Sequence, residues 1–298
     1  MPTNSDRIYA EITDKILAAL DAGTIPWKQP WSTKGGFTLA QRNALTKRPY
    51  RGVNVFTLLL AGREDPRWAT FKQIKKAGGF VKRGSKGQTV IFWKFILVED
   101  EDDAGKKYQK RIPILKSFKV FNVGDTEGLN LENIVAPVDE DGEEFDPIIE
   151  AEAVANNYLL DGPSLSHDGG TRAYYNFTSD EIHLPEKSNF ETAEGYYDTL
   201  FHEIGHSTGH SSRCDLEVGG SFGSHRYGRE ELVAEFTSAF LSSHAGIDQE
   251  VDNQAAYIAS WKRTIKADKR AVVVAAGRAQ RAADLVLGAG LVEEEIAA

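Results

Sequence analysis

The spacing of hydrophobic residues changes along the chain, and each spacing predicts a different element. In residues 5–22 every fourth position is apolar, namely Ile8, Ile12, Ile16 and Leu20. That period, followed by Gly23, predicts an amphipathic helix that ends at the glycine. Residues 88–98 (QTVIFWKFILV) are rich in β-branched and aromatic side chains, which predicts a strand. A second strand near 111–123 is expected to return beside it after the polar turn EDEDDAGKK.

The remaining apolar patterns predict mostly helices. These fall at 54–61, 69–77, 149–160, 190–211, 229–244 and 249–287. The segments 173–177 and 181–184 predict a short hairpin. Residues 131–148 combine two prolines, a glycine and many acids, which is typical of a domain boundary. We therefore expect an α+β protein of two domains: a small basic domain with a β-hairpin sheet (1–130), an acidic linker (131–148) and a mainly helical domain (149–298).

The charge distribution supports this division. Residues 1–130 carry 23 Lys and Arg against 13 Asp and Glu, a net charge of +10, whereas residues 131–298 carry 12 against 31, a net charge of −19. Such asymmetry suggests that one half binds a polyanion. The alternative is a basic face that only aids solubility. We favour nucleic acid, because aromatic residues alternate with the basic ones.

Two classes of protein are disfavoured. No stretch approaches the roughly 20 consecutive apolar residues that a membrane span needs, and the first residues lack the pattern of a signal peptide. The chain has one cysteine, so disulfides cannot stabilise it. We expect a cytoplasmic protein without a membrane partner.

The strongest chemical signal is the sequence HEIGH at 202–206. One helical turn separates His202 from His206, so both imidazoles project from one face of a helix. Two neutral imidazoles suit Zn²⁺, and a catalytic site needs a third ligand. Glu203 can act as a general base toward water polarised by the metal. Gly205 removes bulk between the ligands and lets another backbone approach. The alternative is a surface helix with two ordinary histidines, which the apolar context of the motif disfavours.

A third ligand is predicted in the helix at 229–244. Glu231 and Glu235 are four residues apart at the edge of an apolar stripe, where two carboxylates are costly unless a cation compensates them. We assign Glu231 as the ligand and Glu235 as the acceptor that orients a ligand histidine. Glu230, about 100° round the helix, is the weaker candidate. The alternative is that the carboxylates pair with Arg226 or Arg229.

Other polar residues fall between the two helices. Tyr227 and His225 are candidates for stabilising the oxyanion of a tetrahedral intermediate, or they pack a glycine-rich loop. His210 could be an extra ligand, but a helix-end cap is favoured. Cys214 could be a stray ligand, and a small buried side chain is favoured.

Candidate nucleic-acid contacts concentrate in the first half. The basic ones are Arg42, Lys47, Arg48, Arg51, Lys72, Lys75, Lys76, Lys82, Arg83 and Lys86. Trp27 and Trp31 lie beside Pro26, Lys28 and Pro30, so we expect them to be exposed, as platforms on which unpaired bases stack. The alternative is that most aromatics in the region are core residues, which we expect for Phe92 and Phe95. No pattern predicts reading of duplex DNA in a groove.

Both halves together resemble the ArdC-type antirestriction proteins of conjugative plasmids. The segments that resemble its single-stranded-DNA-binding domain are IPWKQPW, RPYRGVNVFTLL, WATFKQIKKAGGFVKRGSKGQTVIFWK and FKVFNVGDTEGL. The segments HEIGHSTGH and REELVAEFTSAFL resemble its zincin-like metallopeptidase domain. The resemblance implies single-stranded DNA binding and protection of incoming plasmid DNA from host restriction.

Three functional hypotheses follow. The leading one joins single-stranded DNA binding to a zinc peptidase that cuts an unidentified protein, for which a component of the restriction system is one candidate. In the second, the protein is a DNA-binding shield and zinc is structural. In the third, a regulatory peptidase cleaves a repressor. Glu203, which a structural site would not need, favours peptidase capacity.

Overall fold

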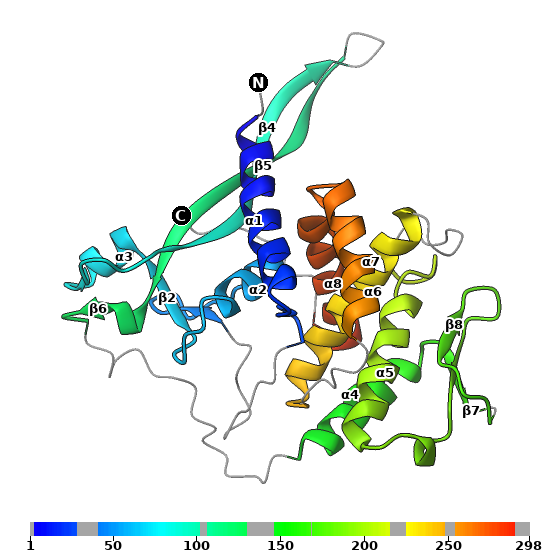
Figure 1. Ribbon diagram of the computed structural model, residues 1–298. Coiled ribbons are helices and arrows are strands. Elements are labelled where there is room, and N and C mark those ends of the chain that lie inside the picture. The colour runs from blue at the N-terminus through cyan, green and yellow to red at the C-terminus, as the bar shows by residue number, and fades with distance from the viewer. Residues whose placement is uncertain are drawn as a thin grey trace.

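The computed structural model describes residues 3–28, 41–101, 106–129, 146–167, 169–214, 225–247 and 254–289. Figure 1 shows a long twisted hairpin on one side of the molecule and a group of helices on the other, with α1 between them. None of the described helices is long and apolar enough to cross a membrane. The fold is of the α+β class, as predicted.

The first half is built on a four-stranded sheet. Its order is β1–β2–β5–β4, from Arg42–Asn43, Arg67–Thr70, Lys107–Asn122 and Gln88–Glu101. β4 and β5 form the predicted antiparallel hairpin, which pairs from Gln88 and Val120 outward to Glu101 and Lys107. A smaller pair joins β3 (Phe80–Val81) to β6 (Thr126–Glu127).

Three helices and one 3₁₀ turn accompany these strands. They are α1 (Asn4–Asp21), α2 (Val53–Leu59), α3 (Phe71–Lys76) and η1 (Val123–Asp125). α1 begins where predicted, because the side chains of Thr3 and Asp6 satisfy each other's backbone N–H in a capping box. Thr70 and Gln73 do the same for α3.

The second half is mainly helical. Its helices are α4 (Pro147–Leu159), α5 (Ala193–Ser207), α6 (His225–His244), α7 (Gln254–Ala267) and α8 (Ala271–Val286), with η2 at Lys187–Asn189. A three-stranded sheet, ordered β7–β9–β8, combines Ser164–His167, Glu181–Leu184 and Tyr174–Asn176. β8 and β9 are the predicted hairpin.

One expectation about this half was wrong, and one strand was not predicted. The single helix expected at 249–287 is two helices, because the side chain of Asp268 accepts the backbone N–H of Arg270 and its carbonyl accepts that of Ala271, which starts α8 anew. The sequence also gave no sign of β7, a short polar strand that pairs in parallel with β9.

The two halves share their largest core. Ile12 of α1 and Phe56 of α2 belong to one buried cluster with Phe236 of α6, Trp261 of α7 and Ala276 of α8. Most of the predicted linker lies outside the described residues, so its boundaries stay a prediction. Because the core crosses that boundary, we expect neither half to keep its packing when the other is removed.

Candidate metal centre

Helices α5 and α6 form the site because they approach each other closely at Gly205. A Cβ atom added to Gly205 would lie 2.9 Å from Cα of Ala234 and 3.0 Å from its carbonyl oxygen. Only glycine permits this approach without displacing α6, as the sequence predicted. The contact holds the Glu231 side of α6 against the histidine face of α5.

The three predicted ligands converge. Nε2 of His206 lies 3.1 Å from Nε2 of His202, and the Glu231 carboxylate oxygens lie 3.7 Å from Nε2 of His202 and 3.6 Å from Nε2 of His206. One donor atom from each residue lies within 4.8 Å of the others. Two imidazoles and a carboxylate on one side of a cleft are the donor set of an open catalytic zinc site. The residues therefore fit a divalent cation.

A carboxylate also faces the far nitrogen of each histidine. Oε1 of Glu235 lies 3.6 Å from Nδ1 of His202, in the place that the sequence assigned to it. Oε1 of Glu230 lies 3.5 Å from Nδ1 of His206. The sequence marked Glu230 only as a weaker ligand candidate, so its position beside His206 was not predicted. Such carboxylates fix the tautomer and the ring orientation of a metal-binding histidine.

Glu230→Gln and Glu235→Gln are each expected to weaken metal binding roughly 10–100-fold, the usual effect of losing such an acceptor. Glu231→Ala removes a ligand and is expected to weaken binding more. Glu191→Gln, at an exposed position, is the control. Competition with a chromophoric chelator measures all four. Wild-type affinity in Glu230→Gln would show that His206 does not depend on this carboxylate.

Glu203 is buried beside the ligands, with 6% of its surface exposed. Burial raises its pKa to about 7, while His206 and a backbone hydrogen bond from Tyr175 oppose the rise. A pKa near neutrality suits a group that must both accept and return a proton.

The two histidines share nearby carboxylates, and their pKa values diverge. Burial lowers the pKa of His202, and His206 lowers it further. Burial lowers the pKa of His206 as well, but Glu230 and Glu231 raise it overall. The pair therefore favours one positive charge, which a bound dication would replace with release of the proton.

Tyr227 lies at the cleft, as the oxyanion prediction requires. Burial raises its pKa, and Glu231, its hydrogen-bond partner, raises it further, so the phenol stays a donor. His225 begins α6, but its side chain lies outside the described part of the chain. His210 accepts the backbone N–H of Ser212 and contacts its hydroxyl, which agrees with a role at the helix end. Cys214 is half-buried.

The predicted exposure of Trp27 was wrong. Its side chain is 1% exposed, and its ring packs 4.7 Å from Phe236 and 5.2 Å from Trp261. Neighbouring Lys28 therefore enters the metal cleft, where Nζ lies 3.6 Å from Asp198 and 3.7 Å from Glu235. Burial lowers the pKa of Lys28, but these two carboxylates raise it overall. Trp27 is therefore not placed to stack on bases, a DNA contact of Lys28 stays a prediction, and Trp31 lies outside the described residues.

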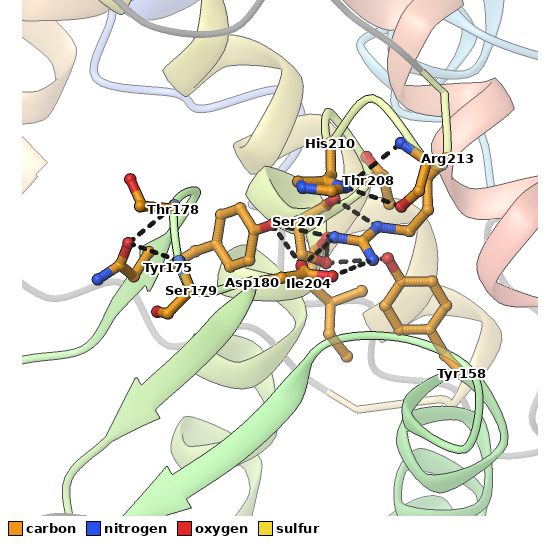
Figure 2. Close-up of polar contacts among 12 residues, drawn as sticks. Tyr158, Tyr175, Thr178, Ser179, Asp180, Ile204, Ser207, Thr208, His210 and Arg213 are labelled. Atoms are coloured by element: carbon orange, nitrogen blue, oxygen red, sulfur yellow. Dashed lines mark hydrogen bonds and ion pairs between the residues drawn. The ribbon is translucent and has the colours of Figure 1, made fainter.

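A polar network at the C-terminal end of α5 anchors the hairpin that borders the cleft (Figure 2). Arg213 forms an ion pair with Asp180 and donates to the hydroxyl of Tyr175 at 3.0 Å and to the carbonyl of Ser207 at 2.8 Å. Tyr158 contacts the Ser207 hydroxyl at 2.9 Å. This network ties β8 to the end of the metal-binding helix. This network was not predicted from the sequence. Its one sequence signal is Asp180, because aspartate is favoured in turns and tolerates the positive φ of +51° that it has here.

The cleft over the ligands has a volume of about 820 Å³. Its walls come from α5, α6, β8 and the segment that carries Lys28. Within the described residues β8 is an edge strand of its sheet, and its residue Tyr175 donates its backbone N–H to Glu203. The cleft is large enough for an extended peptide of a few residues.

The predicted basic contacts differ in their exposure and in their partners. Exposed side chains on or near α3 and β3 are Lys72, Lys75, Lys76, Lys82, Arg83 and Lys86. Lys47 and Arg48 are exposed in the turn after β1, and Arg42 is half-buried. Arg51 forms an ion pair with Asp284 of α8, so part of its charge serves packing between the halves. A DNA contact at each of these residues stays a prediction.

Comparison with known proteins agrees with this arrangement. Residues 6–121 match the family model for the N-terminal domain of the anti-restriction factor ArdC, and residues 152–278 match the model for a zincin-like metallopeptidase. The metal-free structure of the antirestriction protein ArdC from plasmid R388 is 36% identical, with a TM-score of 0.72 over 94% of this chain and 97% of that one. Its Mn(II)-bound structure is 35% identical, with a TM-score of 0.73 over 96% and 99%.

Two curated relatives extend the comparison. The DNA primase TraC of Escherichia coli is 32% identical over 94% of this chain, which spans only 27% of TraC. The protein y4eC of Sinorhizobium fredii (strain NBRC 101917 / NGR234) is 31% identical over 95% of this chain and 92% of its own length.

The fold and the site define a protein that combines an ArdC-type N-terminal domain with a zincin-like metal site. The R388 protein matches nearly end to end at 36% identity. The chain belongs to the ArdC antirestriction family.

Proposed function

We propose that the protein binds single-stranded DNA and protects incoming plasmid DNA from host restriction in the cytoplasm during conjugation, with a zinc peptidase in its second half. The observation that carries the peptidase proposal is the convergence of His202, His206 and Glu231 on a cleft that also holds Glu203. The antirestriction and DNA-binding parts rest on family membership and on the basic first half.

The donor set favours zinc, because two imidazoles and one carboxylate form a recurrent zinc site. The R388 protein has been seen with Mn(II), so metal analysis of the purified chain must distinguish the two. When bound, the cation would polarise a water molecule and a substrate carbonyl.

The protein's own groups would then handle the proton and the charge. Glu203, with its pKa near 7, accepts a proton from water and returns it to the leaving amine. Tyr227, a protonated donor at the cleft, stabilises negative charge that develops on the carbonyl oxygen. Apart from the Tyr175 N–H that donates to Glu203, the edge of β8 can pair with an extended substrate backbone.

Glu203→Gln is expected to lower proteolysis roughly 10²–10⁴-fold, the range for losing a general base. Metal content and single-stranded DNA affinity are expected to stay at the wild-type level, because the substitution removes a base and no ligand. New protein N-termini, mapped in recipient extracts incubated with either variant, measure proteolysis. Equal cleavage by both would contradict the role of Glu203.

The same variant separates the three functional hypotheses in a conjugation assay with a restricting recipient. Loss of protection in Glu203→Gln would show that peptidase chemistry is required. Full protection would favour the DNA-binding shield with structural zinc. A regulatory peptidase would be indicated if the only cleaved protein were a transcriptional repressor.

A further inference from the structure

A groove runs between helix α8 and one face of the long hairpin. Its volume is about 580 Å³, and its walls include Trp93, Phe95 and Arg111 of the hairpin and Arg278 and Arg281 of α8. A second cleft of about 310 Å³ shares Val274 and Arg278 with it. The two together form a track across α8, on residues from both halves of the chain.

The track is strongly cationic. Its arginines are Arg51, Arg111, Arg226, Arg229, Arg270, Arg278 and Arg281, and its acids are Glu230, Asp268 and Asp284. Asp268 pairs with Arg229 and Arg270, and Asp284 pairs with Arg51. Within the described part of the chain, Arg278 and Arg281 form no ion pair. Their guanidinium groups are therefore available to neutralise phosphates.

Aromatic rings lie on the hairpin face of the groove. Ile91, Trp93, Phe95 and Leu97 alternate onto the same face of β4. Ile91 is buried at 5% exposure, whereas Phe95 is 41% and Leu97 is 68% exposed. The expectation that Phe95 belongs to the core was therefore wrong, because this face emerges from the core as the hairpin extends. The Arg111 guanidinium lies 4.0 Å from the centre of the Phe95 ring. A ring and a guanidinium plane of this kind are the surfaces on which unpaired bases stack.

Gly277 leaves the floor of the groove open. It lies on α8 one residue before Arg278, and a Cβ atom added there would meet no atom within 4 Å. A side chain at this position would therefore project into free space, without displacing packed neighbours.

We propose that this groove is where a single DNA strand binds, with phosphates on Arg278 and Arg281 and bases stacked against Phe95 and Trp93. The inference rests on the proposed single-stranded DNA binding and gives that activity a site. The lysines on α3 are exposed but line neither cleft, so they contribute attraction at longer range. Duplex DNA is excluded from the stacking contacts, because its bases already stack on each other.

Gly277→Glu in the full-length chain tests the groove directly, with Gly277→Ala as its matched control. Fluorescence anisotropy with a labelled oligo-dT at two salt concentrations is the measurement. Gly277→Glu is expected to weaken binding more than tenfold, because it places a negative charge and bulk in the path of the strand. Gly277→Ala, which adds one methyl group and no charge, is expected to weaken binding far less than Gly277→Glu.

Side-chain variants give an independent readout. Arg278→Gln with Arg281→Gln is expected to lower the slope of log affinity against log salt by about 1.4, the value for two lost contacts to a single strand. Phe95→Ala is expected to lower the affinity for oligo-dT roughly 5–150-fold, equivalent to about 1–3 kcal/mol for one stacked base. Phe95→Tyr, which keeps an aromatic ring, is expected to retain the affinity. The comparison variant replaces Lys72, Lys75 and Lys76 with glutamine.

The outcomes separate the two levels of the proposal. If the wild type binds oligo-dT and only the α3 variant loses affinity, the groove assignment is overturned while DNA binding stands. If the wild type fails to bind oligo-dT, the proposed DNA-binding function falls and the groove with it. Loss in the groove variants, with circular dichroism and melting temperature unchanged, supports the assignment.

Discussion

His206→Ala is expected to leave the full-length protein without stoichiometric metal, where the wild type holds about one ion per chain. His206 supplies one of three donors, and its Nε2 lies closest to the other two ligand side chains at 3.1 and 3.6 Å. A dication held by only an imidazole and a carboxylate retains few protein ligands. We expect His202→Ala to behave in the same way. Inductively coupled plasma mass spectrometry of dialysed protein measures the ratio.

His210→Ala is the matched control for this result. It removes an imidazole one turn further along the same motif, but His210 contacts Ser212 and is not among the converging donors. Its metal content is expected to equal that of the wild type. Undiminished metal in His206→Ala, or equal loss in His210→Ala, would show that the ion binds elsewhere.

Features that are set within one helix could be predicted from the sequence, whereas features that depend on how two helices pack could not. The histidines of the metal site could be predicted because both lie on one helix, where a spacing of four residues fixes their common direction. Glu231 and Glu235 followed from the cost of placing carboxylates at an apolar edge. The contact between Glu230 and His206 was missed because it depends on the angle at which α6 crosses α5. The periodicity of a single helix carries no information about that angle.

Trp27 shows the opposite case. Proline on both sides of its segment suggested an exposed loop, yet its ring packs against Phe236 and Trp261, more than 200 residues away. Nothing near Trp27 in the sequence marks those partners. The consequence reaches the site, because the buried tryptophan carries Lys28 into the metal cleft beside Glu235.

The net charge of each half also hides features that depend on the fold. Summing charge over each half gave +10 and −19 and placed the DNA contacts in the first half. Arg278 and Arg281 belong to the acidic half, so the sum concealed them. The fold brings both arginines beside the aromatic face of the hairpin, and composition alone cannot show that these residues are neighbours.

Gly205→Ala is expected to destabilise the protein and weaken metal binding at least tenfold. Glycine to alanine inside a helix normally stabilises by about 0.5–1 kcal/mol, because glycine loses more backbone entropy on folding. At Gly205 the sign should reverse. The new Cβ would lie 2.9 Å from Cα of Ala234 and 3.2 Å from Cβ of Thr237, so α5 and α6 must separate. Overpacking of this kind costs roughly 1–3 kcal/mol.

The same separation would pull Glu231, three residues before Ala234, away from the histidines, so stability and metal affinity should fall together. Gly277→Ala is the control, because it makes the same change inside α8 where nothing lies within 4 Å of the added atom. It should raise the melting temperature slightly and leave metal content unchanged. Thermal unfolding and chelator competition on both variants provide the measurement. If Gly205→Ala were as stable as Gly277→Ala and bound metal normally, the close approach of α5 and α6 would not be what positions Glu231.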